Sequence, residues 1–239
     1  MPRFFINEKP NEKVIITGED AVHIGRSLRM KIGEEIVLCH NGMDFLSKIE
    51  NITDKEVVCV VSSIMQSQAE PSISVTLYQA LPKSDKMEFI VQKAVELGVT
   101  KIVPVLTSRC VSRPDAKTFE KKRARLKKIS LSAAKQSGRG IIPEISEILS
   151  IEKAIDDMVK NDLSLICYEK GGASLNSHDF RALKSVGLFI GSEGGFEQAE
   201  VDKCISKGVI PIGLGKRILR CETAPICAIS IIMNLSGNM

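Results

Sequence analysis

The chain has 239 residues, of which 44% are hydrophobic, and this is enough for one or two domains with sizeable cores. No apolar run approaches the ~20 residues of a membrane span, and the first residues turn acidic too soon for a signal peptide, so we expect a cytoplasmic protein that is not bound to a membrane. The seven cysteines form no C-x-x-C pair and the three histidines have no ligand spacing, which argues against a disulfide framework and a metal site.

Residues 1–70 are predicted to form a small β-rich domain. Asn41-Gly42 is typical of a two-residue hairpin turn, and residues 19–31 favour a short helix followed by a basic turn. The basic residues of that turn are either a solvated helix end or contacts to phosphate. The strand candidates are 3–6, 14–17, 35–40, 44–50 and 56–65.

A polar segment that contains Pro71 is the predicted linker, and a second domain is expected over residues 73–239. Strand 73–81 precedes a helix that starts near Asp85, where Glu88 would complete a capping box. Strand 101–107 follows that helix. The alternation of strands and helices continues to the C-terminus, and it predicts an α/β domain with a mostly parallel sheet covered by helices.

Two glycine-bearing loops near the C-terminus are the candidate ligand site. A strand at 186–190 runs into Gly191-Ser-Glu-Gly-Gly195, and a strand at 209–212 runs into the loop 213–225, before a helix through Met233. Glycine lets the backbone approach a ligand closely, although each glycine alone is as readily explained by a turn. Neither loop matches a dinucleotide fingerprint or a P-loop, so a nucleotide-like ligand would be held mostly by backbone groups.

Residues 109–139 hold eleven basic and two acidic residues, whereas the whole chain carries a formal net charge of only +4. An apolar stripe that includes Phe119 and Leu126 predicts a helix with Lys and Arg on its outer face. The alternatives are an ordinary solvated face and a surface that binds a polyphosphate, and the one-signed charge favours the second. Because aromatic residues are scarce, at 4%, a structured RNA held by its backbone is favoured over a stacked single strand.

Several motifs in the chain together resemble the RsmE family, bacterial methyltransferases that modify N3 of a uridine in the decoding region of 16S ribosomal RNA. The similarity covers the whole chain in order, and it departs from the usual pattern at Ser192, where proline is common, and at Cys110 and Ser112 in a basic loop. The motifs are Leu81-Pro-Lys83 with Asp85-Lys-Met-Glu88, Gln92-Lys-Ala-Val-Glu96-Leu-Gly98-Val, Ser108-Arg109, Ala133-Ala-Lys-Gln136-Ser-Gly138-Arg139, Ile190-Gly191-Ser-Glu193-Gly194-Gly195-Phe, Leu214-Gly215-Lys-Arg217-Ile-Leu219-Arg220-Cys-Glu222-Thr223-Ala224 and, near the N-terminus, His23 with Leu28-Arg29-Met-Lys-x-Gly33.

The resemblance implies a C-terminal SPOUT-type domain with a deep trefoil knot and an N-terminal PUA-like β-barrel. It implies a homodimer that acts on 16S rRNA of the small ribosomal subunit, with S-adenosylmethionine as cofactor and no metal. Losing proline at position 192 frees φ there, so the cofactor loop is expected to be looser. The implied cofactor-binding residues are Leu81, Gly191, Ser192, Glu193, Gly194, Gly195, Leu214, Gly215, Ile218, Leu219, Arg220, Thr223 and Ala224.

The expected reaction needs an acceptor for the N3 proton of uridine and a cation that faces the negative charge developing on the base. Glu193 and Glu222 are the carboxylates of the two ligand loops, and Arg220 is the best placed cation. We therefore assign charge stabilisation to Arg220 and proton acceptance to one of the two glutamates. Glu222 is equally well explained as a cap of the last helix.

The expected RNA contacts come from basic residues of both domains. Two other functions stay open on the sequence. One is a SPOUT enzyme that methylates a ribose 2′-oxygen or another base, and the other is a non-catalytic rRNA-binding assembly factor that needs no cofactor. The expected contacts are Arg26, Arg29, Lys31, Lys83, Arg109, Arg113, Lys122, Arg123 and Arg139.

Overall fold

The computed structural model describes the backbone of residues 1–239 and every side chain except that of Ala116. The chain divides into two compact units. The first consists of residues 1–70 with 134–141, and the second of residues 71–133 with 142–239. The second unit thus begins in the predicted linker, but residues 134–141, which we expected within the second domain, are part of the first unit.

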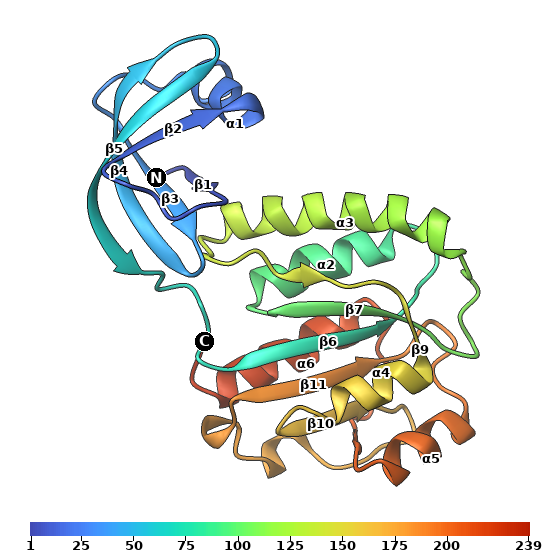
Figure 1. Ribbon diagram of the computed structural model, residues 1–239. Helices are drawn as coiled ribbons and strands as arrows, with labels where there is room; N and C mark the ends of the chain where they lie inside the picture. Colours follow the sequence, from blue (N-terminus) through green and yellow to red (C-terminus); the bar gives the residue numbers. More distant parts are fainter. The chain divides into compact units, whose positions relative to one another are not determined.

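The first unit is built on a five-stranded sheet (Figure 1). Strands β1 and β3 are parallel, and the other neighbours are antiparallel. Asn41 and Gly42 join β3 to β4 with φ angles of 47° and 77°, which only such residues adopt readily, so the predicted hairpin is confirmed. The strands lie in the order β1 (Arg3–Phe5), β3 (Glu35–His40), β4 (Met43–Ile52), β5 (Glu56–Gln66) and β2 (Lys13–Thr17).

A short helix lies between β2 and β3, as predicted. Helix α1 (Gly18–Val22) continues into the π-helical turn η1 (His23–Ser27), which buries Ile24 against the sheet. Arg29 then takes a left-handed φ of 51°. The basic residues of this segment, Arg26, Arg29 and Lys31, are exposed.

The second unit holds a seven-stranded sheet in which every pairing is parallel. Its central strands are buried apolar runs, as expected for strands with both faces covered. The predicted α/β class is therefore confirmed. The order is β12 (Ile210–Ile212), β10 (Leu163–Cys167), β11 (Ser185–Ile190), β6 (Ser74–Ala80), β7 (Lys101–Leu106) and β8 (Glu144–Ile145), with β9 (Leu149–Ser150) also on β7.

Helices pack on both faces of this sheet. Helix α6 contacts α2, whereas α4 contacts β6 and β7, and Figure 1 shows α6 behind the sheet and α4 in front of it. The apolar sides of these helices supply buried residues such as Ile90, Ile155 and Ile229. The helices are α2 (Lys86–Glu96), α3 (Ala116–Gln136), α4 (Ile151–Met158), α5 (Gln198–Ser206) and α6 (Thr223–Leu235), with the 3-10 turns η2 (Leu175–Ser177) and η3 (Phe180–Ala182).

The start of α2 corrects one detail of the sequence analysis. The helix begins after Asp85 as expected, but the Asp85 side chain makes no capping hydrogen bond. Glu88 instead pairs with Arg125 of α3 at 2.8 Å. The predicted capping box is wrong because a partner on another helix takes up the Glu88 carboxylate.

Candidate active site

The loops that follow β10, β11 and β12 line a pocket of about 550 Å³. These strands are parallel neighbours, so their carboxyl ends meet at one edge of the sheet. The pocket brings together most of the residues that we expected to hold a cofactor. Those that line it are Gly191, Ser192, Glu193, Gly194, Gly195, Leu214, Gly215, Ile218, Leu219, Arg220 and Ala224.

Two expected cofactor residues lie elsewhere. Leu81 is fully buried in a cluster with Cys110 and Phe119, beneath the loop that follows β7. Thr223 is exposed at the first position of α6, where its N–H donates to the carbonyl of Arg220. Neither residue lines the pocket among the residues described, so a cofactor contact by either stays a prediction.

The glycines of the loop after β11 are required by close packing. A Cβ on Gly191 would lie 3.1 Å from Cα of Gly195. Gly195 has a φ of 66°, and its N–H donates to the Ser192 carbonyl to close a tight turn. The carboxylate of Glu169, from the loop after β10, lies 3.2 Å from the position of a Cβ on Gly195. The turn therefore folds back on itself and leaves its backbone facing the pocket.

Arg109 fastens the same loop to the loop after β7. Its Nη1 donates to the Gly194 carbonyl at 2.8 Å, and its own carbonyl accepts the Ser192 hydroxyl at 3.3 Å. Arg113 steadies the second loop, since its Nη2 donates to the carbonyls of Thr107 and Ser108. The serine at position 192 thus brings a hydrogen bond that proline would lack, and this bond counters the loosening that we expected.

Lys86, to which the sequence analysis gave no role, lies between the carboxylates of Glu193 and Glu222. Lys86, in the first turn of α2, places its Nζ 3.1 Å from Oε1 of Glu193 and 3.3 Å from Oε2 of Glu222. Glu193 also accepts the backbone N–H of Lys83 at 3.1 Å. Lys86 is part of a motif quoted above, but only its neighbours Asp85 and Glu88 were given a role there.

The ion pairs shift the pKa values of all three groups. Burial opposes ionisation of Glu193, but hydrogen bonds from its own backbone and from the Lys86 ammonium outweigh burial and lower its pKa. The pKa of Glu222 is also lowered, since the Cys221 thiol, its own backbone and Lys86 together outweigh burial. The pKa of Lys86 is raised, chiefly by its hydrogen bond to Glu193. At neutral pH the site therefore holds two carboxylates and one ammonium.

The alternative role of Glu222 as a helix cap is wrong. Glu222 is the residue before α6, but its side chain makes no capping hydrogen bond. The carboxylate forms an ion pair with Lys86. The carbonyl of Arg220 instead accepts the N–H groups of Thr223 and Ala224, each at 2.9 Å. The backbone of Arg220 thus starts α6, and its side chain is exposed at the pocket.

Two of the expected RNA contacts are used inside the protein. Arg139 is 1% exposed and pairs with Glu70 at 2.6 Å, so it cannot reach a phosphate in this structure. The side chain of Arg123 is 17% exposed, pairs with Glu120 at 3.1 Å and donates to the Ile145 carbonyl. The expectation for Arg139 is wrong, and that for Arg123 is weakened, because each guanidinium has a partner in its own unit.

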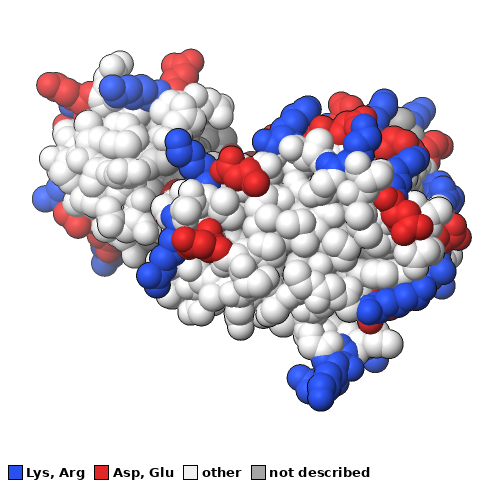
Figure 2. Space-filling view, turned by 90° about the horizontal axis from the view of Figure 1, so that it is seen from below, with Lys and Arg blue, Asp and Glu red and all other residues white. Residues whose placement is uncertain are grey.

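Acidic residues from elsewhere in the chain offset part of the charge of α3. Arg125 pairs with Glu88, and Lys135 pairs with Asp20. Lys122 donates to the Ser84 carbonyl at 3.5 Å. On the face drawn in Figure 2, acidic side chains likewise lie next to basic ones. Besides Arg125, the exposed cations of α3 are Lys117, Lys121, Lys127 and Lys128.

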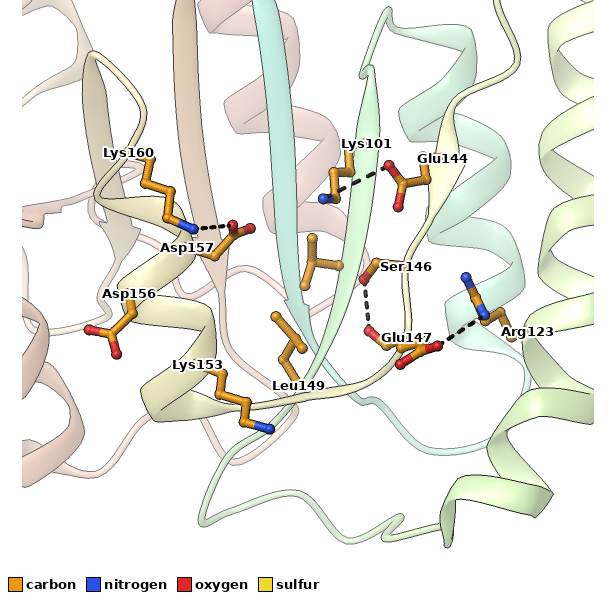
Figure 3. A pocket seen from close by; sticks show the side chains of 11 residues that line it. Lys101, Arg123, Glu144, Ser146, Glu147, Leu149, Lys153, Asp156, Asp157 and Lys160 are labelled. Carbon is orange, nitrogen blue, oxygen red and sulfur yellow. Dashed lines mark hydrogen bonds and ion pairs between the residues drawn. The ribbon is translucent and has the colours of Figure 1, made fainter.

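A second pocket, of about 510 Å³, lies beside β7 and α4 (Figure 3). Its charged side chains pair with one another: Lys101 lies 3.9 Å from Glu144, and Lys160 lies 3.3 Å from Asp157. Arg123 lies 3.9 Å from Glu147 at its rim. Since charges of both signs alternate around this pocket, it has no clear preference for an anion or a cation, and the pocket after β10–β12 is the better candidate site.

Neither a metal-binding group nor a membrane-spanning helix occurs among the described residues. The side chains of the described residues form no group of three or more His, Cys, Asp or Glu that could hold a metal ion. Within the same part of the chain, each helix is too short or too polar to cross a membrane.

Comparisons with known families also find two domains in the chain, although residues 134–141 of the first unit fall within the match to the second domain. Residues 69–233 match the family described as the RNA methyltransferase domain, and residues 16–62 match the RNA methyltransferase PUA domain. The expected PUA-like character of the first unit is thereby confirmed.

Two solved structures are similar over nearly the whole chain. One is a methyltransferase from Legionella pneumophila in complex with SAM, with a TM-score of 0.86 and 31% identity over 97% of this chain and 96% of that one. The other is ribosomal RNA small subunit methyltransferase E from Neisseria gonorrhoeae bound to S-adenosyl methionine, with a TM-score of 0.89 and 30% identity over 98% of each chain.

Two relatives carry the same name as the second structure. The ribosomal RNA small subunit methyltransferase E of Bacillus subtilis is 34% identical over 225 residues, which is 91% of this chain and 88% of that protein. The one from Buchnera aphidicola is 31% identical over 242 residues, which is 100% of this chain and 95% of that protein. On this similarity, together with the matching domains, the chain belongs to the ribosomal RNA small subunit methyltransferase E family.

Proposed function

We propose that the protein transfers the methyl group of S-adenosylmethionine to N3 of one uridine in the decoding region of 16S rRNA. The observation that carries the proposal is the pocket at the carboxyl ends of β10, β11 and β12, with Arg220 and Glu193 at its wall and Glu222 joined to Glu193 through Lys86. The similar structures with bound SAM support the cofactor. Because ribosomal RNA is the substrate, we place the activity in the cytoplasm.

The residues of the pocket fit the cofactor. Its volume of about 550 Å³ is of the size that small-molecule ligands occupy. The close turn from Gly191 to Gly195 leaves backbone N–H and C=O groups that can hold an adenosyl group, and a Cβ would crowd this turn. Leu214, Leu219 and Ala224 would supply apolar contacts. When bound, S-adenosylmethionine supplies an electrophilic methyl group.

The side chains of the pocket then have separable roles. Uridine N3 carries a proton that must leave, and the ionised Glu193 or Glu222 can accept it. The exposed guanidinium of Arg220 faces the pocket and would stabilise the negative charge that develops on the base.

RNA binding is proposed for exposed cations of both units. The exposed cations include Arg26, Arg29 and Lys31 in the first unit and Lys83 in the segment before α2. The four exposed lysines of α3 extend this set. Contacts of this kind to phosphate would offset the few kcal/mol needed to extrude the target base from its stack, and would weaken binding as salt is raised.

Helix α6 supports a homodimer. The helix has no charged residue, yet Ile226, Cys227 and Ile231 are partly exposed. Phe89 of α2, which packs against α6, is 46% exposed. An uncharged helix with an uncovered apolar side is typical of a surface that binds a second copy. We also propose that the C-terminal segment forms the trefoil knot implied by the resemblance to SPOUT enzymes.

The function is tested by methyl transfer with purified components. Tritiated S-adenosylmethionine is incubated with the protein and with small-subunit RNA from a strain that lacks this modification, either free or assembled into subunits. We expect label in 3-methyluridine with at least one of the two substrates, and Arg220→Ala should remove it. Label at a ribose 2′-oxygen, or no label with either substrate, would overturn the proposal.

A further inference from the structure

We infer that Lys86 is a positioning residue that keeps two carboxylates, Glu193 of the pocket and Glu222 beside it, ionised and at a fixed spacing. The inference rests on the proposed function, because it concerns the group that accepts the uridine proton. Lys86 itself lines the pocket, and its polar contacts run to side chains: Glu193, Glu222 and, at 3.9 Å, the thiol of Cys221.

The location of Lys86 is unfavourable for its own helix. It occupies the first turn of α2, where the helix dipole favours acidic residues and disfavours cations. The ammonium of Lys86 therefore does not stabilise the helix. Its unfavourable interaction with the helix dipole is offset by two carboxylates, one in the loop that follows β11 and the other in the segment that precedes α6. Lys86 thus ties together the two segments that form the pocket.

The charges around Lys86 come from every element packed against it. The loop after β11 supplies Glu193, and the segment before α6 supplies Glu222 and Cys221, whose thiol donates to Glu222 at 3.2 Å. Burial raises the pKa of that thiol to about 12, so it stays neutral. With Lys86 the cluster carries one net negative charge. Without it, two like charges would share a partly buried site, and the pKa of at least one carboxylate would rise.

A proton acceptor must be ionised before the reaction starts. If Lys86 were replaced by an apolar residue, the pKa of the acceptor would rise, so the acceptor would become protonated and activity would be lost at a higher pH than in the parent protein. The loop after β11 would keep its shape, because Arg109 and the turn from Ser192 to Gly195 hold it independently of Lys86. The expected loss therefore lies in kcat and its pH dependence, and not in cofactor affinity.

The experiment compares Lys86→Met, which keeps the aliphatic stem, with Lys86→Arg, which restores the cation. Lys93→Met is the matched control, because Lys93 lies on the same helix and pairs with Glu96 at 2.8 Å away from the pocket. For each, kcat and KM are measured from pH 4 to 9, so that the profiles cover the acid limb of a glutamate, and SAM binding is measured by calorimetry.

For Lys86→Met we expect the acid limb of the kcat profile to move up by about one pH unit, so that kcat falls by up to about tenfold on the acid side. The dissociation constant of SAM should change by less than about threefold, which corresponds to under 1 kcal/mol. Lys86→Arg should return the limb to its original position, and Lys93→Met should match the parent protein.

Three outcomes would overturn the inference: an acid limb that does not move, a loss confined to SAM affinity, or no rescue by Lys86→Arg. A second readout does not depend on activity. In protein labelled with ¹³C at glutamate carboxyls, the resonances removed by Glu193→Gln and Glu222→Gln identify the pair, and Lys86→Met should raise the midpoint of at least one. Unchanged midpoints contradict the role of Lys86, whereas absence of methyl transfer by the parent protein contradicts the proposed function alone.

Discussion

The cations of the pocket differ in what holds them. Lys86 is fixed between two carboxylates, whereas Arg220 engages the fold through its carbonyl and leaves its guanidinium exposed. A side chain that is exposed at the pocket is available to a substrate, and a side chain held in ion pairs prepares the groups around it. This difference separates a group that acts on the base from one that acts through its neighbours.

The first prediction concerns Arg220→Ala. Because Arg220 would face charge that develops only during transfer, kcat should fall by about 100- to 1,000-fold, as for the loss of an oxyanion donor. SAM affinity, measured by calorimetry, should be nearly unchanged. Arg181→Ala, in an exposed turn outside the pocket, is the control and should keep full activity. Loss of SAM affinity with unchanged kcat would contradict the role of Arg220.

The second prediction concerns the serine that replaces the usual proline. Ser192→Ala removes the hydroxyl that donates to the Arg109 carbonyl, a bond worth about 0.5–1.5 kcal/mol. We expect the dissociation constant of SAM to rise by about two- to tenfold. Ser206→Ala, which removes a similar bond to the Lys203 carbonyl on α5, should leave SAM binding unchanged. Equal affinities for the two variants would show that the hydroxyl does not support the loop.

At the scale of elements, one hydrogen bond joins the central strand β6 to helix α4. The hydroxyl of Tyr78 donates to Oδ2 of Asp157 at 2.8 Å. Burial works against ionisation of Asp157, but this bond and the nearby lysines outweigh burial and lower its pKa. A carboxylate whose pKa is lowered by folding stabilises the folded state above its ordinary pKa of 3.8, and this contribution is lost as pH falls through the lowered value.

The third prediction follows from this linkage. Tyr78→Phe should lower the free energy of unfolding by about 1.5–3 kcal/mol at pH 7, because the bond goes to a charged acceptor. The difference from the parent protein should shrink as pH is lowered below 4, in denaturant titrations. In the control Tyr168→Phe, the lost bond goes to the neutral amide of Gln198, so its cost should not depend on pH. A pH-independent cost for Tyr78→Phe would contradict the linkage.

The helices, strands and loops show which features of the structure could be predicted from the sequence. The sheet and the pocket could be predicted because both depend on local sequence patterns. The sheet follows from the alternation of strands and helices, and the pocket follows from the strands that are followed by Gly191 and Gly213. The pairing of Arg139 with Glu70, 69 residues away, was not visible, because charge counting takes no account of partners distant in the sequence. Lys86 was missed for the same reason: its two glutamates lie far along the chain.

For the whole molecule, the main open feature is the uncovered side of α6. Helix α6 has no charged residue, and its Ile226, Cys227 and Ile231 are partly exposed. An apolar surface of this kind is costly to leave in water, which is why we propose that a second copy covers it.

The fourth prediction is therefore that the protein has twice the mass of one 26.2 kDa chain in light scattering. Ile231→Arg, which places a charge on the exposed side of α6, should halve this mass. Ile15→Arg is the control, since Ile15 is 60% exposed in the first unit and should not affect assembly. A single-chain mass for the parent protein, or a dimer that survives Ile231→Arg, would contradict the role given to α6.

The most direct test of the account is mass spectrometry of nucleosides from small-subunit RNA of cells with and without this protein. The account predicts 3-methyluridine in the RNA of cells that contain the protein, its loss when the protein is deleted, and its return with the parent sequence but not with Arg220→Ala. If 3-methyluridine is present at the same level in the deleted cells, the central claim is contradicted.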